Sequence, residues 1–290
     1  MSKPNILHLI TTAKNASPFD VNMAIDAGFE HIVPYTSVLQ NEVVALTQDA
    51  MFSRSPSGVK REALFFGGRD IHVALEMQAA AKNAMFAPFE LSTLADPSGA
   101  FTTAAAMLAK INAHQNLANQ TVAIFGASGT VGSTAALIAA AHGAQVLLVA
   151  HKELPSMQAH TDTLQMRYDV KLQVADGSND AAKTTVLNIA TVAICAAAAG
   201  VRVLELAHFS QSKSLKIIAD VNAVAPSGVA GLDAINDGRL IENTNIVGIG
   251  ALAIGQLKYV TQHKLLQQLL GEAPLHLAYN DAYLVACESR

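Results

Sequence analysis

Short apolar runs alternate with longer amphipathic segments along the whole chain. The clearest example is the stretch 121–150, which reads as an apolar run (122–125), a glycine turn, a helical segment (130–142) and a second apolar run (145–149). Both runs are short and rich in branched aliphatic residues, as is typical of strands covered on both faces of a parallel sheet. The order predicts a strand–turn–helix–strand unit.

The same alternation continues on both sides of this unit. Before it, strands are expected at 5–10, 31–35, 63–66 and 90–94, with helices at 17–27, 39–52, 71–85 and 101–114 and a polar loop at 53–58. After it, strands are expected at 171–174, 191–195 and 216–220, with helices at 153–168, 180–188, 203–209 and 253–270. Regular alternation of this kind predicts an α/β protein.

The chain is long enough for one large domain or for two of ordinary size. The tetrapeptide Asp96-Pro97-Ser98-Gly99 interrupts the pattern, which places a boundary near residue 100. We expect a two-lobe structure: a Rossmann-type parallel sheet formed by 101–252, and a smaller α/β substrate domain formed by 1–100 and joined by a C-terminal helix, 253–290. A ligand is expected in the cleft between the lobes.

Composition excludes several classes of partner. Charged residues make up only 14% of the chain and the net charge is −4, so no basic face for nucleic acid is expected. The most apolar stretch, 186–201, is shorter than the about 20 residues of a membrane span, and the N-terminal apolar run is too short for a signal peptide. Cys195 and Cys287 have neither disulfide nor metal spacing. We expect a cytoplasmic protein without metal, membrane or nucleic acid.

The glycine turn is the strongest motif. Gly126, Gly129 and Gly132 fall three residues apart, on the turn and the first helical residues. Glycine there allows a tight turn, a close approach of backbone N–H groups to a pyrophosphate, and close packing of helix on strand. The cofactor-binding prediction covers the whole turn: Gly126, Ala127, Ser128, Gly129, Thr130, Val131 and Gly132. The alternative is a glycine-rich turn that binds nothing.

The end of the second strand bears on the choice of nicotinamide cofactor. An NAD enzyme usually has an acidic residue there, for the ribose hydroxyls. Here His151 and Lys152 follow the strand, and no carboxylate appears before Glu153. A histidine and a lysine favour a 2′-phosphate, so NADP, or either of NADP and NAD, is expected. The alternative is two solvated polar residues that close a strand.

The sequence contains no motif that would supply a dedicated pair of proton-transfer residues. Tyr-x-x-x-Lys, His-x-x-x-His and cysteine clusters are absent from the sequence. A hydride transfer without such a pair would rest on positioning and electrostatics. The polar residues expected near the ligand are Lys14 and Asp20, Asp96 with Thr102 and Thr103, Asp220 with Asn222, and Lys258. Helix capping and surface polarity are the alternative interpretation of each.

At these residues the sequence resembles the methylene-tetrahydromethanopterin dehydrogenases of methylotrophic bacteria. The resemblance covers nearly the whole chain and looks closest to the branch that accepts NAD as well as NADP. Its matching segments are 17–28 (SPFDVNMAIDAG), 65–70 (FFGGRD), 95–107 (ADPSGAFTTAAAM), 218–233 (IADVNAVAPSGVAGLD) and 248–259 (GIGALAIGQLKY). Two features depart from the family: Ala127-Ser128 in the middle of the glycine turn, and Lys152 where some relatives have an acid.

The resemblance implies a reversible hydride transfer from the methylene bridge of a reduced pterin to NAD(P), giving the methenyl form, in one-carbon oxidation. It implies a tetrahydromethanopterin-type carrier, tetrahydrofolate as a secondary substrate in some relatives, and a homo-oligomer such as a trimer. By position, the pterin side would be lined by Lys14, Asp20, Asp96, Thr102, Thr103 and Lys258. Asp20 or Asp96 would stabilise the cation, and Lys258 would hold a polar group of the pterin.

Two other functions remain open. One is an NADP-dependent methylene-tetrahydrofolate dehydrogenase, because the same cleft would hold that substrate. The other is a non-enzymatic NADP-sensing module, in which the cleft meets a protein partner. A sensor needs no cluster of lysine and aspartate around a ligand, so a cluster of this kind favours the enzymes.

Overall fold

The computed structural model describes residues 3–290, and the chain divides into two compact units. Unit 1 takes the chain up to residue 102 together with residues 259–289, and unit 2 takes residues 103–258 with residue 290. The chain enters unit 2 within helix α5 (Ala100–His114) and returns to unit 1 within helix α10 (Ala251–Gln268). Each unit is built around a parallel sheet, so the predicted α/β fold class is confirmed.

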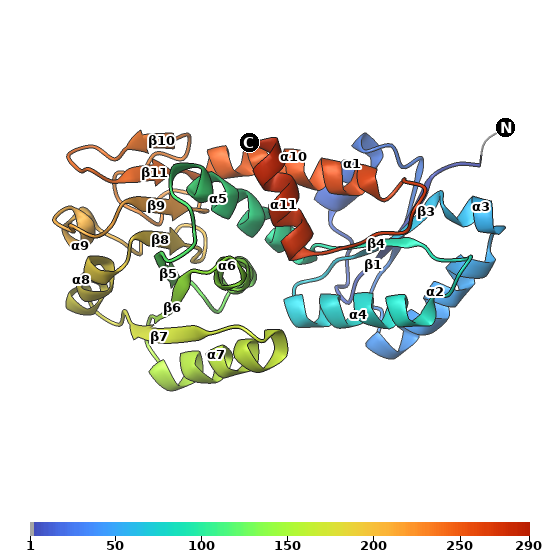
Figure 1. Cartoon of the computed structure of the whole chain (residues 1–290), viewed down its shortest axis with the longest axis horizontal. Coiled ribbons are helices and arrows are strands. Elements are labelled where there is room, and N and C mark those ends of the chain that lie inside the picture. The colour runs from blue at the N-terminus through green and yellow to red at the C-terminus, as the bar shows by residue number, and fades with distance from the viewer. Residues whose placement is uncertain (1–2) are drawn as a thin grey trace. The chain divides into compact units, whose positions relative to one another are not determined.

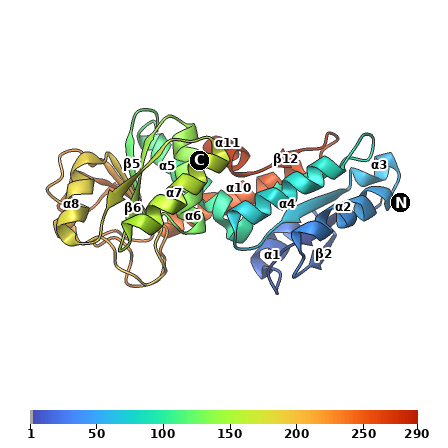
Figure 2. The same cartoon turned by 90° about the horizontal axis from the view of Figure 1, so that it is seen from below.

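Unit 1 contains a five-stranded, all-parallel sheet in the order β12-β4-β3-β1-β2 (Figures 1 and 2). Its strands are β1 (Ile6–Ile10), β2 (His31–Tyr35), β3 (Glu62–Phe66), β4 (Ser92–Ala95) and β12 (His276–Leu277). Every residue of β3 and β4 is buried, whereas the edge strand β2 is largely exposed. Burial on both faces explains the apolar run 63–66 of β3, although Glu62, Ser92 and Thr93 show that these strands also bury polar residues.

Local sequence fixes where the helices of unit 1 begin. Ser17 caps α1, whose first residue is Pro18, and Asp70 caps α4 by accepting from the N–H groups of His72 and Val73. Helices α2 and α4 pack side by side (Figure 2). The helices are α1 (Pro18–Asp26), η1 (Gln40–Glu42), α2 (Val43–Phe52), α3 (Pro56–Val59), α4 (Ile71–Ala84), η2 (Pro97–Gly99) and α11 (Tyr279–Ser289).

Unit 2 contains a seven-stranded sheet in the order β10-β11-β9-β8-β5-β6-β7, which Figure 1 shows as successive strands. All neighbours are parallel except β10, which runs antiparallel to β11. The strands are β5 (Thr121–Phe125), β6 (Gln145–Ala150), β7 (Leu172–Asp176), β8 (Val192–Cys195), β9 (Ile217–Asp220), β10 (Asp237–Leu240) and β11 (Val247–Ile249). The helices between them are α6 (Thr130–Ala141), α7 (Leu154–Tyr168), α8 (Asp180–Ile189) and α9 (Leu206–Phe209).

In both sheets the order in which successive strands are added reverses at one internal strand. In unit 1, β1 lies between β2 and β3, and in unit 2, β5 lies between β6 and β8. The loops that follow the two strands at such a switch point diverge to opposite faces and leave a crevice at the carboxyl edge, where α/β proteins bind ligands. The topology therefore predicts one ligand site in each unit. In unit 1 it lies at the loops after β1 and β3, and in unit 2 at the loops after β5 and β8.

Several boundaries differ from those expected from the sequence. The prediction of one C-terminal helix over 253–290 is wrong, because α10 ends at Gln268, and β12 and α11 follow as separate elements. Gly271 and Pro274 account for the break, since Pro274 has no amide hydrogen to continue a helix. The expected polar loop 53–58 contains the start of α3, and the helix expected from residue 203 begins at Leu206.

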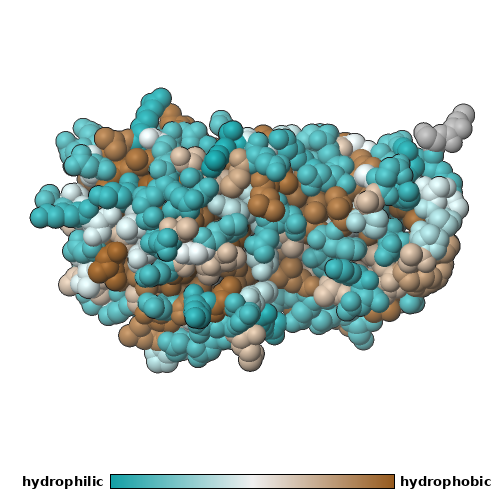
Figure 3. Space-filling model, in the orientation of Figure 1, coloured by the Kyte–Doolittle hydropathy of each residue, from teal (hydrophilic) through white to brown (hydrophobic). Residues whose placement is uncertain are grey.

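The strands β10, β11 and β12 were not expected. Strand β10 has the sequence DGRL and is mostly exposed, and β12 has two residues, so neither carries the apolar pattern of a central strand. Within residues 3–290, no helix combines the length and the hydropathy that crossing a membrane requires. Hydrophilic and hydrophobic residues are intermixed on the face drawn in Figure 3.

Candidate functional site

The turn after β5 brings backbone segments so close that two positions accept only glycine. Gly126 has φ of +78°, and a Cβ there would lie 2.5 Å from the carbonyl oxygen of Ala196. A Cβ on Gly132 would lie 2.4 Å from the carbonyl oxygen of Gly126. Contact with backbone excludes a side chain at both positions, and the positive φ adds strain at Gly126. The spacing seen in the sequence therefore has a steric cause.

Helix α6 starts immediately after this turn. Its N-cap is Gly129, which has no side chain to accept from the N–H groups of the first turn. The turn is braced by Ser133, whose hydroxyl donates to the carbonyl oxygen of Ala127 at 2.9 Å and lies 3.0 Å from Nε2 of His160. Backbone N–H groups and the positive end of the helix dipole together make a suitable site for a phosphate group.

A cavity of about 370 Å³ opens beside the turn, within unit 2. Its walls are mostly apolar, which suits the flat faces of an adenine ring. Its volume falls in the range usual for small-molecule sites. The glycine turn and the loop after β8 contribute most of the lining. The full lining is Phe125, Gly126, Ser128, Gly129, Val149, His151, Gly177, Lys183, Ala196, Ala197, Ala198, Val201, Arg202 and Val203.

The ionisable residues that line this cavity are basic. Lys183 donates to the carbonyl oxygen of Val203 at 3.0 Å, and Arg202 donates to that of Ser227 at 2.6 Å. His151 is the third basic residue, and none of the lining residues, all in the described part of the chain, is Asp or Glu. The nearby carboxylates Asp180 and Glu205 are exposed partners of the two cations and offset them only weakly. The residues present fit a dinucleotide that carries an additional phosphate.

The residues predicted to bind the cofactor separate into two groups. Gly126, Ser128, Gly129 and His151 line the cavity. Ala127 is buried inside the turn, and Thr130, Val131 and Gly132 form the first turn of α6. Lys152 is exposed beside His151 and is not a lining residue. Asp220 and Asn222 also lie outside the lining, so their predicted contact with the cofactor stays a prediction.

Asp220 and Asn222 organise the loop after β9. The carboxylate of Asp220 accepts from the N–H groups of Asn222 (2.9 Å) and Val229 (3.2 Å). Asn222 accepts from Val224 and donates to the carbonyl oxygen of Pro226. Burial raises the pKa of Asp220, and the hydrogen bonds from the N–H groups of Asn222 and Val229 partly oppose that rise. Burial next to the Asp220 charge raises the pKa of Cys195 to about 12, so this thiol is not a nucleophile.

In unit 1, the loops after β1, β3 and β4 meet at the carboxyl edge of the sheet. Gly68 has φ of +111°, and a Cβ there would lie 3.2 Å from the hydroxyl of Thr12. The hydroxyl of Ser98 donates to the carbonyl oxygen of Gly68 at 2.8 Å. Ser98 itself has a positive φ of 54°, which is uncommon for a residue other than glycine. The exposed Lys14 belongs to the first of these loops.

The two carboxylates predicted for the pterin side are both buried, with different partners. Asp20, in the first turn of α1, accepts from the side-chain amide of Gln262 in α10 at 2.9 Å. Asp96, directly after β4, accepts from the backbone N–H groups of Phe101 and Thr102 and from the hydroxyl of Thr102. Asp96 therefore holds the start of α5, as the capping interpretation expected.

Comparison with known proteins adds a second line of evidence. A family model described as methylene-tetrahydromethanopterin dehydrogenase, N-terminal, matches residues 18–98. The chain is also 40% identical over 291 residues, 98% of each chain, to the NAD(P)-dependent methylenetetrahydromethanopterin dehydrogenase of Methylorubrum extorquens. The chain belongs to the methylene-tetrahydromethanopterin dehydrogenase family. The Bifunctional protein MdtA of the same organism is 32% identical over 272 residues, 89% of each chain.

Among solved structures, this chain is similar to shikimate 5-dehydrogenase from Listeria monocytogenes, crystallised with shikimate and NAD. The TM-score is 0.53, with 14% identity over 94% of this chain and 93% of that one. Because the identity is only 14%, this similarity shows the α/β fold alone.

The segment matched by the methylene-tetrahydromethanopterin dehydrogenase model lies wholly in unit 1. It contains Asp20 and Asp96, whereas Lys14 precedes it and Thr102 follows it. Thr103 and Lys258 are the first and last residues of the 103–258 segment of unit 2, on α5 and α10. The pterin-binding roles expected for these six residues stay predictions.

Besides the apolar lining of the cavity, sequence reasoning missed Gly177, Lys183 and Arg202 in the cavity, and Gln262 beside Asp20. Gly177 carries a readable signal, because Asp-Gly-Ser follows a predicted strand. Its Cβ would lie 2.4 Å from Cγ1 of Val149, which explains the glycine. The other three lie within helices or loops and carry no local signal.

Proposed function

We propose that this protein is an NAD(P)-dependent methylene-tetrahydromethanopterin dehydrogenase. The reaction is a reversible transfer of hydride from the methylene carbon of a reduced, one-carbon-carrying pterin to NAD(P), which leaves the methenyl form. The observation that carries the proposal is the 40% identity, across 98% of both chains, to the relative that bears this name. The glycine turn of unit 2 and its basic cavity support the cofactor half of the reaction.

Bound NAD(P) supplies the hydride acceptor, and unit 2 would hold it. The N–H groups at the start of α6 bind the pyrophosphate, and the apolar walls around Val149 and Val201 take the adenosine. His151, and Lys152 beside it, would lie near the ribose of a bound cofactor, where positive charge would tolerate a 2′-phosphate. This arrangement supports use of NADP as well as NAD. Asp220 and Asn222 would act indirectly, by fixing the loop after β9.

Unit 1 would hold the pterin at the carboxyl edge of its sheet. Of the two candidate carboxylates, we assign Asp20 to stabilise the developing cation by its charge, because Asp96 has a structural role at the start of α5. Asp96 accepts three hydrogen bonds from the start of α5, and it would act chiefly by positioning Thr102 and Thr103. Lys14 and Lys258 would bind polar groups of the pterin. Lys258 lies one turn before Gln262 in α10, on the same helix face.

The remaining assignments follow from the same proposal. Residues 1–100 with the C-terminal segment form the substrate domain, and 101–252 the nucleotide domain. The protein acts in one-carbon oxidation of a methylotroph, in the cytoplasm, as a homo-oligomer such as a trimer. The free, buried thiol of Cys195 supports a reducing compartment.

The direct test is to record the absorbance of reduced nicotinamide with NAD or NADP and with each of methylene-tetrahydromethanopterin and methylene-tetrahydrofolate. We expect reduction with the methanopterin substrate. Reduction with the folate substrate alone would make the protein a folate dehydrogenase. If neither pterin supports reduction while calorimetry still shows NADP binding, the protein is a nucleotide sensor.

A further inference from the structure

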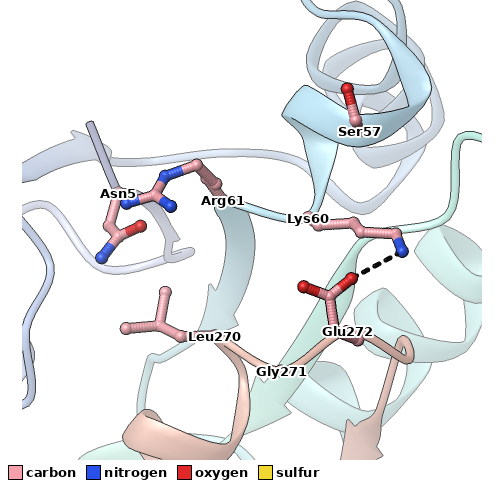
Figure 4. Close-up of a pocket in the computed structure, with 7 residues that line it drawn as sticks. All are labelled: Asn5, Ser57, Lys60, Arg61, Leu270, Gly271 and Glu272. Carbon is pink, nitrogen blue, oxygen red and sulfur yellow. Dashed lines mark hydrogen bonds and ion pairs between the residues drawn. The ribbon is translucent and has the colours of Figure 1, made fainter. Parts of the chain in front are cut away.

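A second candidate site lies in unit 1, at the edge of the sheet opposite to the loops described above. The residues there precede the strands: Asn5 comes directly before β1, and Arg61 directly before β3. Together with Leu270 and Gly271, which follow α10, they surround a hollow of about 270 Å³ (Figure 4). The hollow is lined by Asn5, Ser57, Lys60, Arg61, Leu270, Gly271 and Glu272. The proposed reaction does not use these residues.

One side chain of this hollow lacks an internal partner. Nε of Arg61 is buried, and no described residue accepts its hydrogen. The nearby Arg54 shows the usual arrangement, because its Nε pairs with the buried Glu62 at 2.6 Å and its Nη1 donates to the carbonyl oxygen of Pro4. A buried donor without an acceptor destabilises the folded state, and a charged one does so more strongly. An acceptor from outside the chain would remove this cost once a shift of the Arg61 side chain brings Nε to the hollow.

A second cation is present but occupied. Nζ of Lys60 lies 2.8 Å from Oε2 of Glu272, and Figure 4 shows this ion pair at the side of the hollow away from Asn5. The pair is weak because it is solvated: Lys60 is 45% exposed and Glu272 is 92% exposed. Opening it would place two adjacent positive side chains at one hollow. A neighbouring hollow shares Lys60, Gly271 and Glu272 but also contains Glu90, which disfavours an anion there.

We propose that the hollow at Arg61 binds a phosphate-type oxyanion, either free phosphate or the phosphoryl group of a small metabolite. Arg61 supplies the planar fork that matches such oxygens, and Lys60 supplies a point charge. Ser57 and Asn5 add neutral hydrogen-bonding groups. Glu272 is the internal competitor, which holds Lys60 when no anion is bound. The site is independent of the pterin and of NAD(P).

A rival explanation assigns both cations a structural role. Helix α10 ends at Gln268, beside the hollow, and its negative C-terminal dipole would attract Lys60 and Arg61 without any ligand. The two explanations differ at Glu272. Removing this carboxylate frees Lys60 and strengthens anion binding in our proposal, whereas the structural explanation predicts no anion binding to strengthen.

The test is calorimetric titration of the full-length protein with inorganic phosphate, at constant ionic strength set with chloride. We expect Arg61→Gln to weaken phosphate binding about 10-fold or more, and Glu272→Gln to strengthen it about 3-fold, since charge-assisted hydrogen bonds are lost or gained. Lys82→Gln removes an exposed cation of the same unit from a position outside the hollow and should leave affinity unchanged. The difference between wild type and Arg61→Gln separates this site from phosphate held elsewhere.

Several outcomes would overturn the proposal: no phosphate binding by the wild type, equal affinity in wild type and Arg61→Gln, or no gain in Glu272→Gln. The last variant changes a residue that is 92% exposed, so a folding defect cannot account for its result. Titration with glycerol phosphate then separates the two sources of the anion. Tighter binding of the ester identifies a phosphorylated metabolite, and tighter binding of inorganic phosphate identifies the free ion.

Discussion

The two units use the same kind of sheet but supply their functional groups differently. In unit 2 one continuous heptapeptide, 126–132, provides the phosphate-binding turn, and it does so with backbone atoms and missing side chains. In unit 1 the candidate groups are side chains from distant segments, and the hydrogen bond between Asp20 and Gln262 joins residues 242 positions apart. A backbone site tolerates little change at its glycines, whereas a side-chain site depends on charge at single positions.

The first prediction compares the cysteines, one in each unit. Cys195 is buried in unit 2 and its pKa is raised from 9.0 to about 12, whereas Cys287 in α11 of unit 1 is partly buried. At mildly alkaline pH the thiolate fraction of Cys195 is then about 1,000-fold lower than that of an ordinary cysteine. A disulfide reagent should modify Cys287 quickly and Cys195 at least about 1,000-fold more slowly, as followed by mass spectrometry.

A Cys287→Ser variant provides the control, because only Cys195 can then react. Fast modification of that variant under native conditions would contradict the burial of Cys195. The sign of the pH dependence follows from the same shift. The folded state keeps the Cys195 proton to higher pH than the unfolded state, so this thiol's contribution to stability falls as pH rises from about 9 toward 12.

The second prediction tests the backbone site of unit 2. In Gly132→Ala the new Cβ meets the carbonyl oxygen of Gly126 at 2.4 Å, and neither backbone segment can yield easily. The turn should open to relieve this contact, and closing it again around the pyrophosphate would cost up to about 3 kcal/mol, so NADP affinity should fall up to about 150-fold, measured by fluorescence titration. Gly255→Ala in α10 is the matched control. Apart from the backbone of its own helix, no described atom lies within 4 Å of its Cβ, so it should gain up to about 1 kcal/mol in stability.

These contrasts explain what could be predicted from the sequence. The glycine turn was readable because its three glycines fall within seven residues, although the backbone that excludes a side chain at Gly126 belongs to Ala196. Most strands were readable because burial on both faces leaves apolar runs, such as 63–66 in β3. The division of α10 from α11 and the pairing of β12 with β4 depend on contacts 183 residues apart, such as that between Thr93 and His276. Arg202 and Gln262 are likewise selected by tertiary neighbours, so no local pattern marks them.

The third prediction tests charge in unit 1. Asp20→Asn keeps an oxygen for the amide of Gln262 and removes the negative charge. If this carboxylate stabilises the cation, kcat should fall about 100-fold while the melting temperature and cofactor affinity stay close to wild type. Asp26→Asn is the matched control, because Asp26 lies on the same helix and binds the hydroxyl of Tyr259, but is exposed. A large loss of kcat in Asp26→Asn, or none in Asp20→Asn, would remove Asp20 from the mechanism.

The smallest expected effect concerns the one place in unit 2 where side chains, not backbone, are proposed to discriminate. Lys152→Glu puts a carboxylate where the ribose hydroxyls of NAD would be bound and a 2′-phosphate repelled. The ratio of kcat/KM for NADP to that for NAD should fall about 10-fold, since one solvated charge is worth about 1 kcal/mol. Lys171→Glu makes the same charge change at an exposed position before β7 and should leave the ratio unaltered. An unaltered ratio in Lys152→Glu would instead assign the phosphate to His151, Lys183 and Arg202, the basic residues that line the cavity itself.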